Sequence, residues 1–207
     1  MLYLDNAATT PLLPEVRKVM INYMVDNFGN PSSIYKIGRM NKIAVEEARK
    51  SIAETIGACP DDIFFTSGGT ESDNWVLESA AESATESDSA HIIVSAIEHP
   101  AVINKCIQLK KRGCDVDYIK TDKNGIINTD DLISKIRDDT KLISVMLVNN
   151  EIGTIQPVKN VCNIAAEYAI PVHTDAVAAY GHIPVNVKEL GVDYLSVSAH
   201  KIGGAKG

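Results

Sequence analysis

Long apolar runs and an excess of basic residues are both missing from this sequence of 207 residues. No segment has the uninterrupted apolar length of a membrane span, and residues 1–5 do not have the pattern of a signal peptide. Lysine and arginine number 20 against 27 aspartates and glutamates, which gives a net charge of −7. We therefore expect neither membrane insertion nor binding to nucleic acid.

Cysteine is also sparse, and its spacing excludes two kinds of site. The four cysteines are scattered through the chain without CxxC or His/Cys ligand spacing: Cys59, Cys106, Cys114 and Cys162. This pattern predicts no metal site and no disulfide framework, and it is typical of reduced thiols in a cytoplasmic protein. Cys106 and Cys162 fall within helical apolar patterns, so we expect them in the core.

What the sequence does have is an alternation of short apolar runs with helical patterns. Such alternation predicts an α/β fold with a mainly parallel, doubly wound sheet and helices on both faces, in one domain over residues 1–207. The Ser- and Glu-rich residues 82–89 are expected to form a surface loop. The expected strands are 63–66, 91–95, 116–119, 142–148, 171–174 and 193–197, and the expected helices are 14–23, 34–56, 71–84, 100–107, 129–136 and 158–168.

Three reactive side chains follow the last apolar run, at Ser198, His200 and Lys201. In open α/β sheets, ligands bind at the carboxyl ends of the strands. A lysine amine there can form a Schiff base with a cofactor aldehyde, while a serine and a histidine can donate hydrogen bonds to its phosphate. Taken alone, the same pattern also fits an ordinary surface lysine after a strand.

Two further loops between a strand and a helix carry candidate ligand-binding residues. Gly69 and Thr70 open a helix, where backbone N–H groups and a hydroxyl can bind a phosphate. His99 follows the second expected strand and could stack on a flat heteroaromatic ring or move protons. Both signals have ordinary alternatives: a Gly-Gly turn before a helix is common, and His99 could simply cap a helix or lie in the core.

Two polar residues at the ends of apolar strands complete the set. Asn150 follows the most apolar strand, where a side-chain amide points to a ligand or a tight turn. Asp175 ends another strand, and a carboxylate there could keep a pyridine nitrogen protonated and make that ring an electron sink. Phosphate donors, a ring-facing imidazole, a partner for a pyridine nitrogen and an amine together match one cofactor, pyridoxal phosphate.

The motifs that carry these residues also resemble, in order along the whole chain, those of a known family. The chain is similar to cysteine desulfurases of the NifS/IscS type, in the class V aminotransferase group of fold-type I pyridoxal-phosphate enzymes. The matching segments are residues 3–10, 28–33, 66–74, 98–99, 148–153, 173–176 and 198–201.

The resemblance implies a role for each candidate residue. Lys201 would bind the cofactor covalently and shuttle protons, and His99 would stack on the ring and act as an acid or base. Asp175 would pair with the pyridine nitrogen, and Asn150 would orient cofactor and substrate. The remaining residues would bind the phosphate: Gly69, Thr70, Ser198 and His200.

The resemblance also implies an activity and partners. The parent enzyme would remove sulfur from L-cysteine, giving L-alanine and a persulfide, and would act as a homodimer with a sulfur-acceptor scaffold protein of iron–sulfur cluster biogenesis. Alternatives are another class V lyase or transaminase, such as a selenocysteine lyase, or a non-catalytic dimerising partner.

Two departures from the family pattern bear on activity. Ala178 stands where the family usually has a glutamine that donates a hydrogen bond to the cofactor's phenolic oxygen. The chain also ends at Gly207, so we expect a truncated large domain without the C-terminal small domain, the substrate-binding arginine and the nucleophilic cysteine. We therefore expect this chain alone to bind pyridoxal phosphate without turnover.

Overall fold

The computed structural model describes residues 2–83 and 90–206, and the chain divides into two compact units. Residues 66–198 form the first, here called the sheet unit, and residues 1–65 with 199–207 form the second, the helical unit. Most of the expected surface loop at 82–89 lies outside the described residues. The single domain expected over residues 1–207 stays a prediction.

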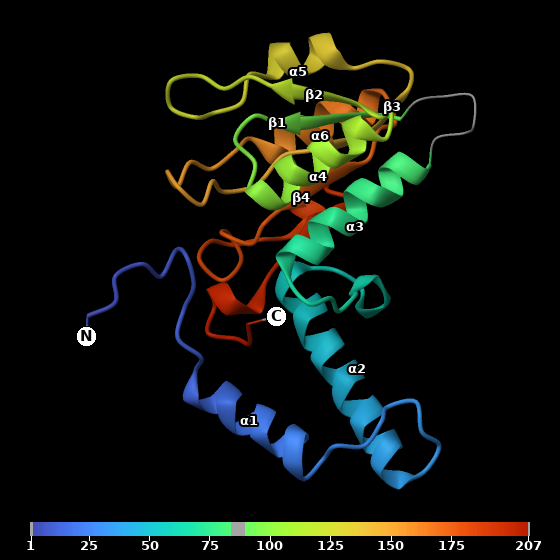
Figure 1. Ribbon diagram of the computed structural model, residues 1–207, viewed down its shortest axis with the longest axis vertical. Coiled ribbons are helices and arrows are strands. Elements are labelled where there is room, and N and C mark those ends of the chain that lie inside the picture. The colour runs from blue at the N-terminus through green and yellow to red at the C-terminus, as the bar shows by residue number, and fades with distance from the viewer. Residues whose placement is uncertain (1, 84–89, 207) are drawn as a thin grey trace. The chain divides into compact units, whose positions relative to one another are not determined.

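The sheet unit contains a parallel sheet whose strands are ordered β2-β1-β3-β4-β5 (Figure 1). Its register pairs Ile93 with Asp117, and Ile143 with Val172. This arrangement confirms the predicted α/β class and the parallel sheet. The strands are β1 (His91–Ser95), β2 (Asp115–Ile119), β3 (Thr140–Ser144), β4 (Val172–Asp175) and β5 (Tyr194–Ser196).

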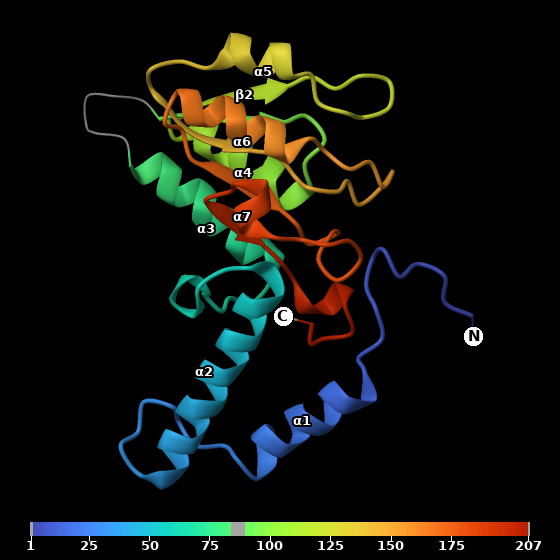
Figure 2. The same ribbon diagram turned by 180° about the vertical axis from the view of Figure 1, so that it is seen from behind.

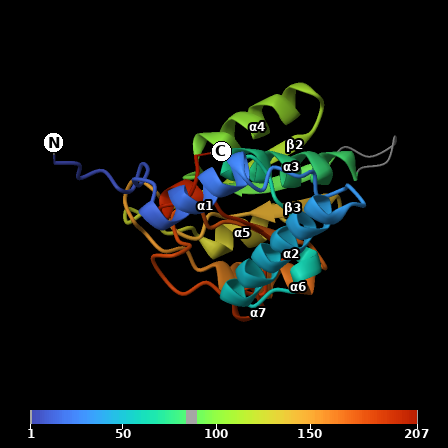
Figure 3. The same ribbon diagram turned by 90° about the horizontal axis from the view of Figure 1, so that it is seen from below.

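Helices cover both faces of this sheet, as Figure 3 shows from below. On one face lie α3 (Gly69–Glu82) and α4 (Pro100–Lys111). On the other lie α5 (Thr129–Lys135), α6 (Val158–Glu167) and α7 (Val187–Leu190), which Figure 2 shows from behind. Neighbouring side chains of a strand point to opposite faces of the sheet. Because helices cover both faces, every residue of β1 is buried.

Two apolar clusters form the core, one on each face of the sheet. Ile92 and Val94 of β1 pack with Leu77 of α3 and Val102 of α4. Ile93, between them in sequence, packs in the opposite cluster with residues of β3 and α6, including Ile143, Val161 and Cys162. Cys106 and Cys162 are both buried, which confirms their predicted place in the core.

The helical unit is built from α1 (Pro14–Val25), α2 (Lys36–Ile56) and two short 3₁₀ turns, η1 (Pro60–Asp62) and η2 (Ala199–Lys201). α2 ends at Gly57, whose φ of 73° is the left-handed conformation that commonly closes a helix. Within this unit, the segment before α1 runs beside η2, as Figures 1 and 2 agree. Hydrogen bonds join the two, including that from Leu13 N to Gly203 O at 2.9 Å.

The strand predicted at residues 63–66 is wrong, because these residues form no strand in the structure. A strand needs a neighbour for its backbone N–H and C=O groups. Here the Ile63 carbonyl instead accepts a hydrogen bond from the Arg49 guanidinium, which also lies 5.0 Å from the centre of the Phe65 ring. Phe64 and Phe65 remain exposed.

Candidate active site

The strand order of the sheet unit creates a switch point between β1 and β3. The chain leaves β1 for β2 on one side and later continues through β3, β4 and β5 on the other. Ligands of open α/β sheets bind outside the carboxyl ends of the strands at such a point. The residues that follow the strand ends all belong to this edge, and they include His99 after β1, Asn150 after β3, Asp175 at the end of β4 and Ser198 after β5.

The first turn of α3 lies beside Ser198, so the expected phosphate donors come together. A Cβ at Gly68 would lie 3.8 Å from Ser198 Oγ, and one at Gly69 would lie 3.7 Å from Ser198 Cβ and only 2.7 Å from Val177 Cγ2. Gly68 has a φ of 153° and no side chain caps the helix. Thr70 is exposed in the same turn. The absence of Cβ atoms therefore leaves backbone N–H groups open to an anion.

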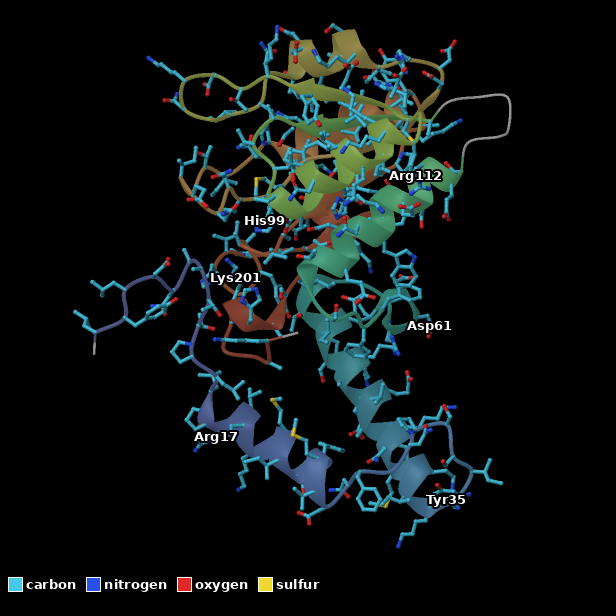
Figure 4. All side chains as sticks on the ribbon, viewed as in Figure 1. Arg17, Tyr35, Asp61, His99, Arg112 and Lys201 are labelled. Atoms are coloured by element: carbon cyan, nitrogen blue, oxygen red, sulfur yellow. The ribbon has the colours of Figure 1, made fainter. Side chains whose placement is uncertain are left out.

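His99 is the N-cap residue of α4 and is half-buried there (Figure 4). Its Nδ1 accepts a hydrogen bond from the Ala101 amide at 3.1 Å. In the neutral ring the proton must then be on Nε2. His99 therefore does cap the helix, as one of the alternatives from the sequence had it, but only through Nδ1. The same hydrogen bond fixes the orientation of the ring and leaves Nε2 as its N–H donor.

The two asparagines after β3 differ in their surroundings. Asn149 is buried, and its Nδ2 donates to Ile97 O at 2.9 Å, which joins the loop after β1 to the loop after β3. Its Oδ1 accepts from the backbone of Glu151 and Ile152 in a tight turn. Asn150 is only half-buried, and its amide donates to the Glu151 carboxylate at 2.9 Å. Asn149 therefore fixes the conformation of the loop after β3, whereas the Asn150 side chain is partly accessible to a ligand.

Asp175 ends β4 in a buried position, with 4% of its surface exposed. Its Oδ1 accepts a hydrogen bond from Val177 N at 2.8 Å. Ala178, three residues further on, is half-buried and brings no hydrogen-bond donor in its side chain. The carboxylate expected from the sequence is thus in place, whereas the donor usual in the family is not.

A buried polar network, which the sequence analysis missed, lies behind Asp175. His173 is fully buried; its Nδ1 is 2.8 Å from Ser144 Oγ and its Nε2 is 2.9 Å from Ser196 Oγ. The same Nε2 is 3.5 Å from Asp73 Oδ1, at the first buried position of α3. Burial lowers the pKa of His173 to about 4, so this ring is neutral at pH 7.

Asp73 and Glu98 are buried carboxyl groups with raised pKa values. Burial first, and then the charge of Asp175, raise the pKa of Asp73 to about 8. Burial also raises the pKa of Glu98 to about 8, although its Oε1 accepts hydrogen bonds from Ser95 Oγ at 2.5 Å and Met146 N at 2.7 Å. The spacing of Asp73 with Leu77 and Ala80 on the buried stripe of α3 was the available signal for the first of these.

His200 and Lys201 lie in the helical unit, in η2. His200 Nδ1 is 3.1 Å from Thr9 Oγ1, and burial, followed by the charges of Lys201 and Lys206, lowers the pKa of His200. The Lys201 amine is half-buried and donates to the backbone carbonyl of Ala7 (Figure 4). These two candidates are thus positioned by the segment before α1, while the other six belong to the sheet unit.

Neither metal ligands nor a membrane-spanning helix is found in the part of the chain that the structure describes. There, no three His, Cys, Asp or Glu side chains gather as metal ligands would. In the same residues no helix has both the length and the apolar character needed to span a bilayer.

Comparison with known proteins identifies the family. The model of the family described as "Aminotransferase class-V" matches residues 2–207. The chain belongs to the class V aminotransferases. Members of this group depend on pyridoxal phosphate.

The relatives and solved structures that this class V aminotransferase chain matches are larger than it is. Cysteine desulfurase IscS of Methanosarcina thermophila is 52% identical over 205 residues, which is 99% of this chain and 50% of the relative. A solved NifS-like protein superposes with a TM-score of 0.95 at 40% identity, covering all of this chain and 57% of the other. SspA in complex with cysteine gives a TM-score of 0.94 at 38% identity, covering all of this chain and 59% of the other.

These comparisons confirm the resemblance to NifS/IscS-type proteins and the corresponding fold. The chain spans about half the length of the curated relatives it matches. The roles of the individual site residues stay predictions.

Proposed function

We propose that this chain is the cofactor-binding part of a pyridoxal-phosphate-dependent cysteine desulfurase. The whole enzyme would take sulfur from L-cysteine, releasing L-alanine and leaving a persulfide. One observation carries the proposal. The glycine turn at the start of α3 lies beside Ser198, at the same edge of the sheet where Asp175 is buried. The 52% identity to a cysteine desulfurase supports the choice of substrate.

The residues present fit pyridoxal phosphate in their donor chemistry. The turn at Gly69 and Thr70 offers N–H groups and a hydroxyl to the phosphate, because a side chain at Gly69 would collide with Val177 and fill the space. Ser198 adds a second hydroxyl at the same turn. His200 would add an imidazole donor, and Asn150 an amide toward cofactor and substrate.

When bound, pyridoxal phosphate supplies an aldehyde for an amine and a ring that withdraws electrons. This chain's residues would tune that ring and move protons. Asp175, a buried carboxyl group at the end of β4, would hold a proton on the pyridine nitrogen. His99 would stack on the ring and move protons through Nε2, since Nδ1 already accepts a hydrogen bond from the Ala101 amide. Lys201 would bind the aldehyde carbon and then carry a proton to and from the substrate.

Partners and location extend the same proposal. A homodimer is supported by the exposed apolar residues of α1, none of whose twelve residues is buried. A sulfur-acceptor scaffold protein, which the family resemblance implies, belongs to the same proposal. The cytoplasmic location expected from the scattered cysteines stays a prediction.

The test is to locate the cofactor by chemistry. The full chain is incubated with pyridoxal phosphate, reduced with borohydride and digested, and the peptides are identified by mass spectrometry. We expect a pyridoxyl group on Lys201, and none in the Lys201→Ala variant. An adduct on another residue, such as the nearby Lys206, would sink the proposal. Cysteine and selenocysteine offered to the longer protein then distinguish a desulfurase from a selenocysteine lyase, and no product from either points to a non-catalytic partner.

A further inference from the structure

The hydroxyl of Thr10 bridges two backbone groups on either side of Lys201. Thr10 Oγ1 donates a hydrogen bond to His200 O at 2.8 Å and accepts one from Gly203 N at 2.6 Å. A hydroxyl has one donor and two acceptor positions, so it can make both bonds at once. One side chain thus fixes the residue before Lys201 and the second residue after it, across 190 and 193 positions of sequence.

Neighbouring contacts extend this bridge into a continuous clamp. The backbone N–H of Thr10 donates to the same His200 carbonyl at 2.9 Å, and Leu13 N donates to Gly203 O at 2.9 Å. A Cβ at Gly203 would lie 2.5 Å from Leu13 Cγ, so the leucine packs closely on this turn. The Lys201 amine itself donates to the Ala7 carbonyl. Residues 7–13 therefore hold residues 200–203 through backbone, side chain and packing together.

The clamped turn is short, and its own hydrogen bonds are few: Ile202 N and Gly204 N both donate to Ala199 O. It is a single 3₁₀ turn of three residues, and short 3₁₀ turns are poorly stabilised by their own hydrogen bonds. It is followed by Gly203, whose φ is 80°, and by Gly204. Glycines leave the backbone many alternative conformations. Removal of the Thr10 hydroxyl would take away two of the hydrogen bonds that hold this turn, so the Lys201 amine would be held less firmly in one position.

We propose that Thr10 is a positioning residue for Lys201, which it orients for reaction through the two backbone groups that its hydroxyl joins. This inference rests on the proposed function, because it takes Lys201 as the residue that binds the cofactor. A lysine side chain that is already held in one geometry reacts faster than a mobile one, because its conformational entropy has been lost before the cofactor binds. Removal of the hydroxyl should therefore slow cofactor attachment without unfolding the chain.

The test compares three variants of the full chain. Thr10→Val removes the hydroxyl at nearly constant volume, and Thr10→Ser keeps the hydroxyl. Thr55→Val is a matched control, because Thr55 is exposed at the end of α2 and its hydroxyl donates to Ile52 O at 2.7 Å, within its own helix. The rate of borohydride-trapped adduct formation on Lys201 is measured first. Amide hydrogen exchange at Gly203 is then measured without cofactor.

We expect Thr10→Val to slow attachment by at least about tenfold and to speed exchange at Gly203 by a similar factor, from the loss of two hydrogen bonds. Thr10→Ser and Thr55→Val should behave like the wild type. If Thr10→Val does not fold by circular dichroism, Thr10→Ala replaces it, since alanine adds no bulk.

The outcomes separate the two proposals. An adduct on Lys201 that forms at the wild-type rate in Thr10→Val overturns the positioning role alone. No adduct on Lys201 in the wild-type chain overturns the proposed function and the positioning role with it. A slow Thr10→Ser variant also contradicts the inference, because the hydroxyl would then not be the cause.

Discussion

Asp175 and Asp73 illustrate how one buried carboxyl group sets the charge of another. Burial is the main reason that the pKa of Asp73 is raised, and the negative charge of Asp175 is the next. With its pKa raised to about 8, Asp73 keeps its proton at neutral pH and adds no negative charge beside Asp175. The pair therefore matches the proposed chemistry better than two ionised carboxylates would.

Replacing Asp175 by asparagine should lower the pKa of Asp73, because the neighbouring charge is removed. That pKa should stay above its ordinary value of 3.8, since burial remains. The measurement is a pH titration of the Asp73 carboxyl carbon by NMR. Asp122→Asn, at a position whose pKa is lowered by the Ile126 amide, is the control and should change nothing. An unchanged Asp73 titration in Asp175→Asn would mean that the two groups do not interact.

Glu98 should make the stability of the chain depend on pH. Its pKa is raised from 4.5 to about 8 by burial, so the folded chain keeps a proton that the unfolded chain loses. This contribution to stability is complete below pH 4.5, and it is lost as the pH rises toward 8. His173 acts in the opposite sense: its pKa is lowered to about 4, and its contribution is lost as the pH falls from 6.5 to 4.

The Glu98→Gln variant isolates the first effect. Glutamine keeps an acceptor oxygen for Ser95 and Met146 but cannot ionise. The free energy of unfolding of the wild type, relative to Glu98→Gln, should fall by about 5 kcal/mol between pH 4.5 and 8. Urea unfolding at a series of pH values measures this difference. A constant difference across that range would mean that Glu98 has an ordinary pKa in the folded chain.

At the scale of residues, the sequence allowed us to predict the polar side chains at strand ends, but not the buried polar network next to Asp175. Asp175 and Ser198 could be predicted because a polar residue after an apolar run marks a strand end. Asp73 and His173 could not be assigned a function, since their partners come from other elements and only the fold brings them together. Thr10 was part of a recognised motif, yet its two bonds join residues 190 and 193 positions apart.

At the scale of elements, the start of α3 depends on a glycine that packs against the loop after β4. A Cβ at Gly69 would lie 2.7 Å from Val177 Cγ2, so Gly69→Ala should destabilise the chain by about 1–3 kcal/mol through overpacking. Val177→Ala in the same chain should remove most of this penalty. Urea unfolding of both single variants and of the double variant measures the coupling. If the effects of the two substitutions on the free energy of unfolding were additive, residues other than Val177 would be making room for the alanine.

The exposed apolar surface of α1 leads to a second prediction at the scale of elements. It exposes Val19, Met24 and Val25, with Phe28 beyond its end, and an apolar surface of this kind is typical of an interface. We expect a dimer at micromolar concentration, and we expect Met24→Lys to weaken it. Ile133→Lys, at an exposed position of α5, is the control. Sedimentation measures the association, and a wild-type chain that sediments as a monomer would contradict the proposed homodimer.

Elements with strong periodicity were predicted, and elements that depend on neighbours were not. Helices at 100–107 and 158–168 were predicted close to α4 and α6 because both amphipathic stripes are regular. Residues 63–66 have the composition of a strand but no strand beside them in the described structure. The helix predicted at 129–136 corresponds to α5. It begins at Thr129 because the Asn128 side chain caps it, with Oδ1 accepting hydrogen bonds from the Asp130 and Asp131 amides.

At the scale of the whole molecule, the cysteines bear on activity. Burial raises the pKa of Cys106 to about 12 and that of Cys162 to about 11, and it also raises the pKa of Cys114. Cys59 is exposed just after α2, in the helical unit. A thiol must be a thiolate to attack a substrate's sulfur, and these three raised pKa values keep the thiols protonated at neutral pH.

We therefore expect this chain alone to bind pyridoxal phosphate without turning over cysteine, because desulfuration needs both the cofactor and an ionised thiol that reaches the substrate's sulfur. Purified chain is mixed with L-cysteine and excess pyridoxal phosphate, and alanine and sulfide are measured against the free-cofactor background. Titration with an aromatic disulfide reagent should find Cys59 reactive and Cys106 and Cys162 protected until unfolding. Alanine above background that disappears in Lys201→Ala would contradict the prediction, and loss of that alanine in Cys59→Ser would identify the thiol responsible.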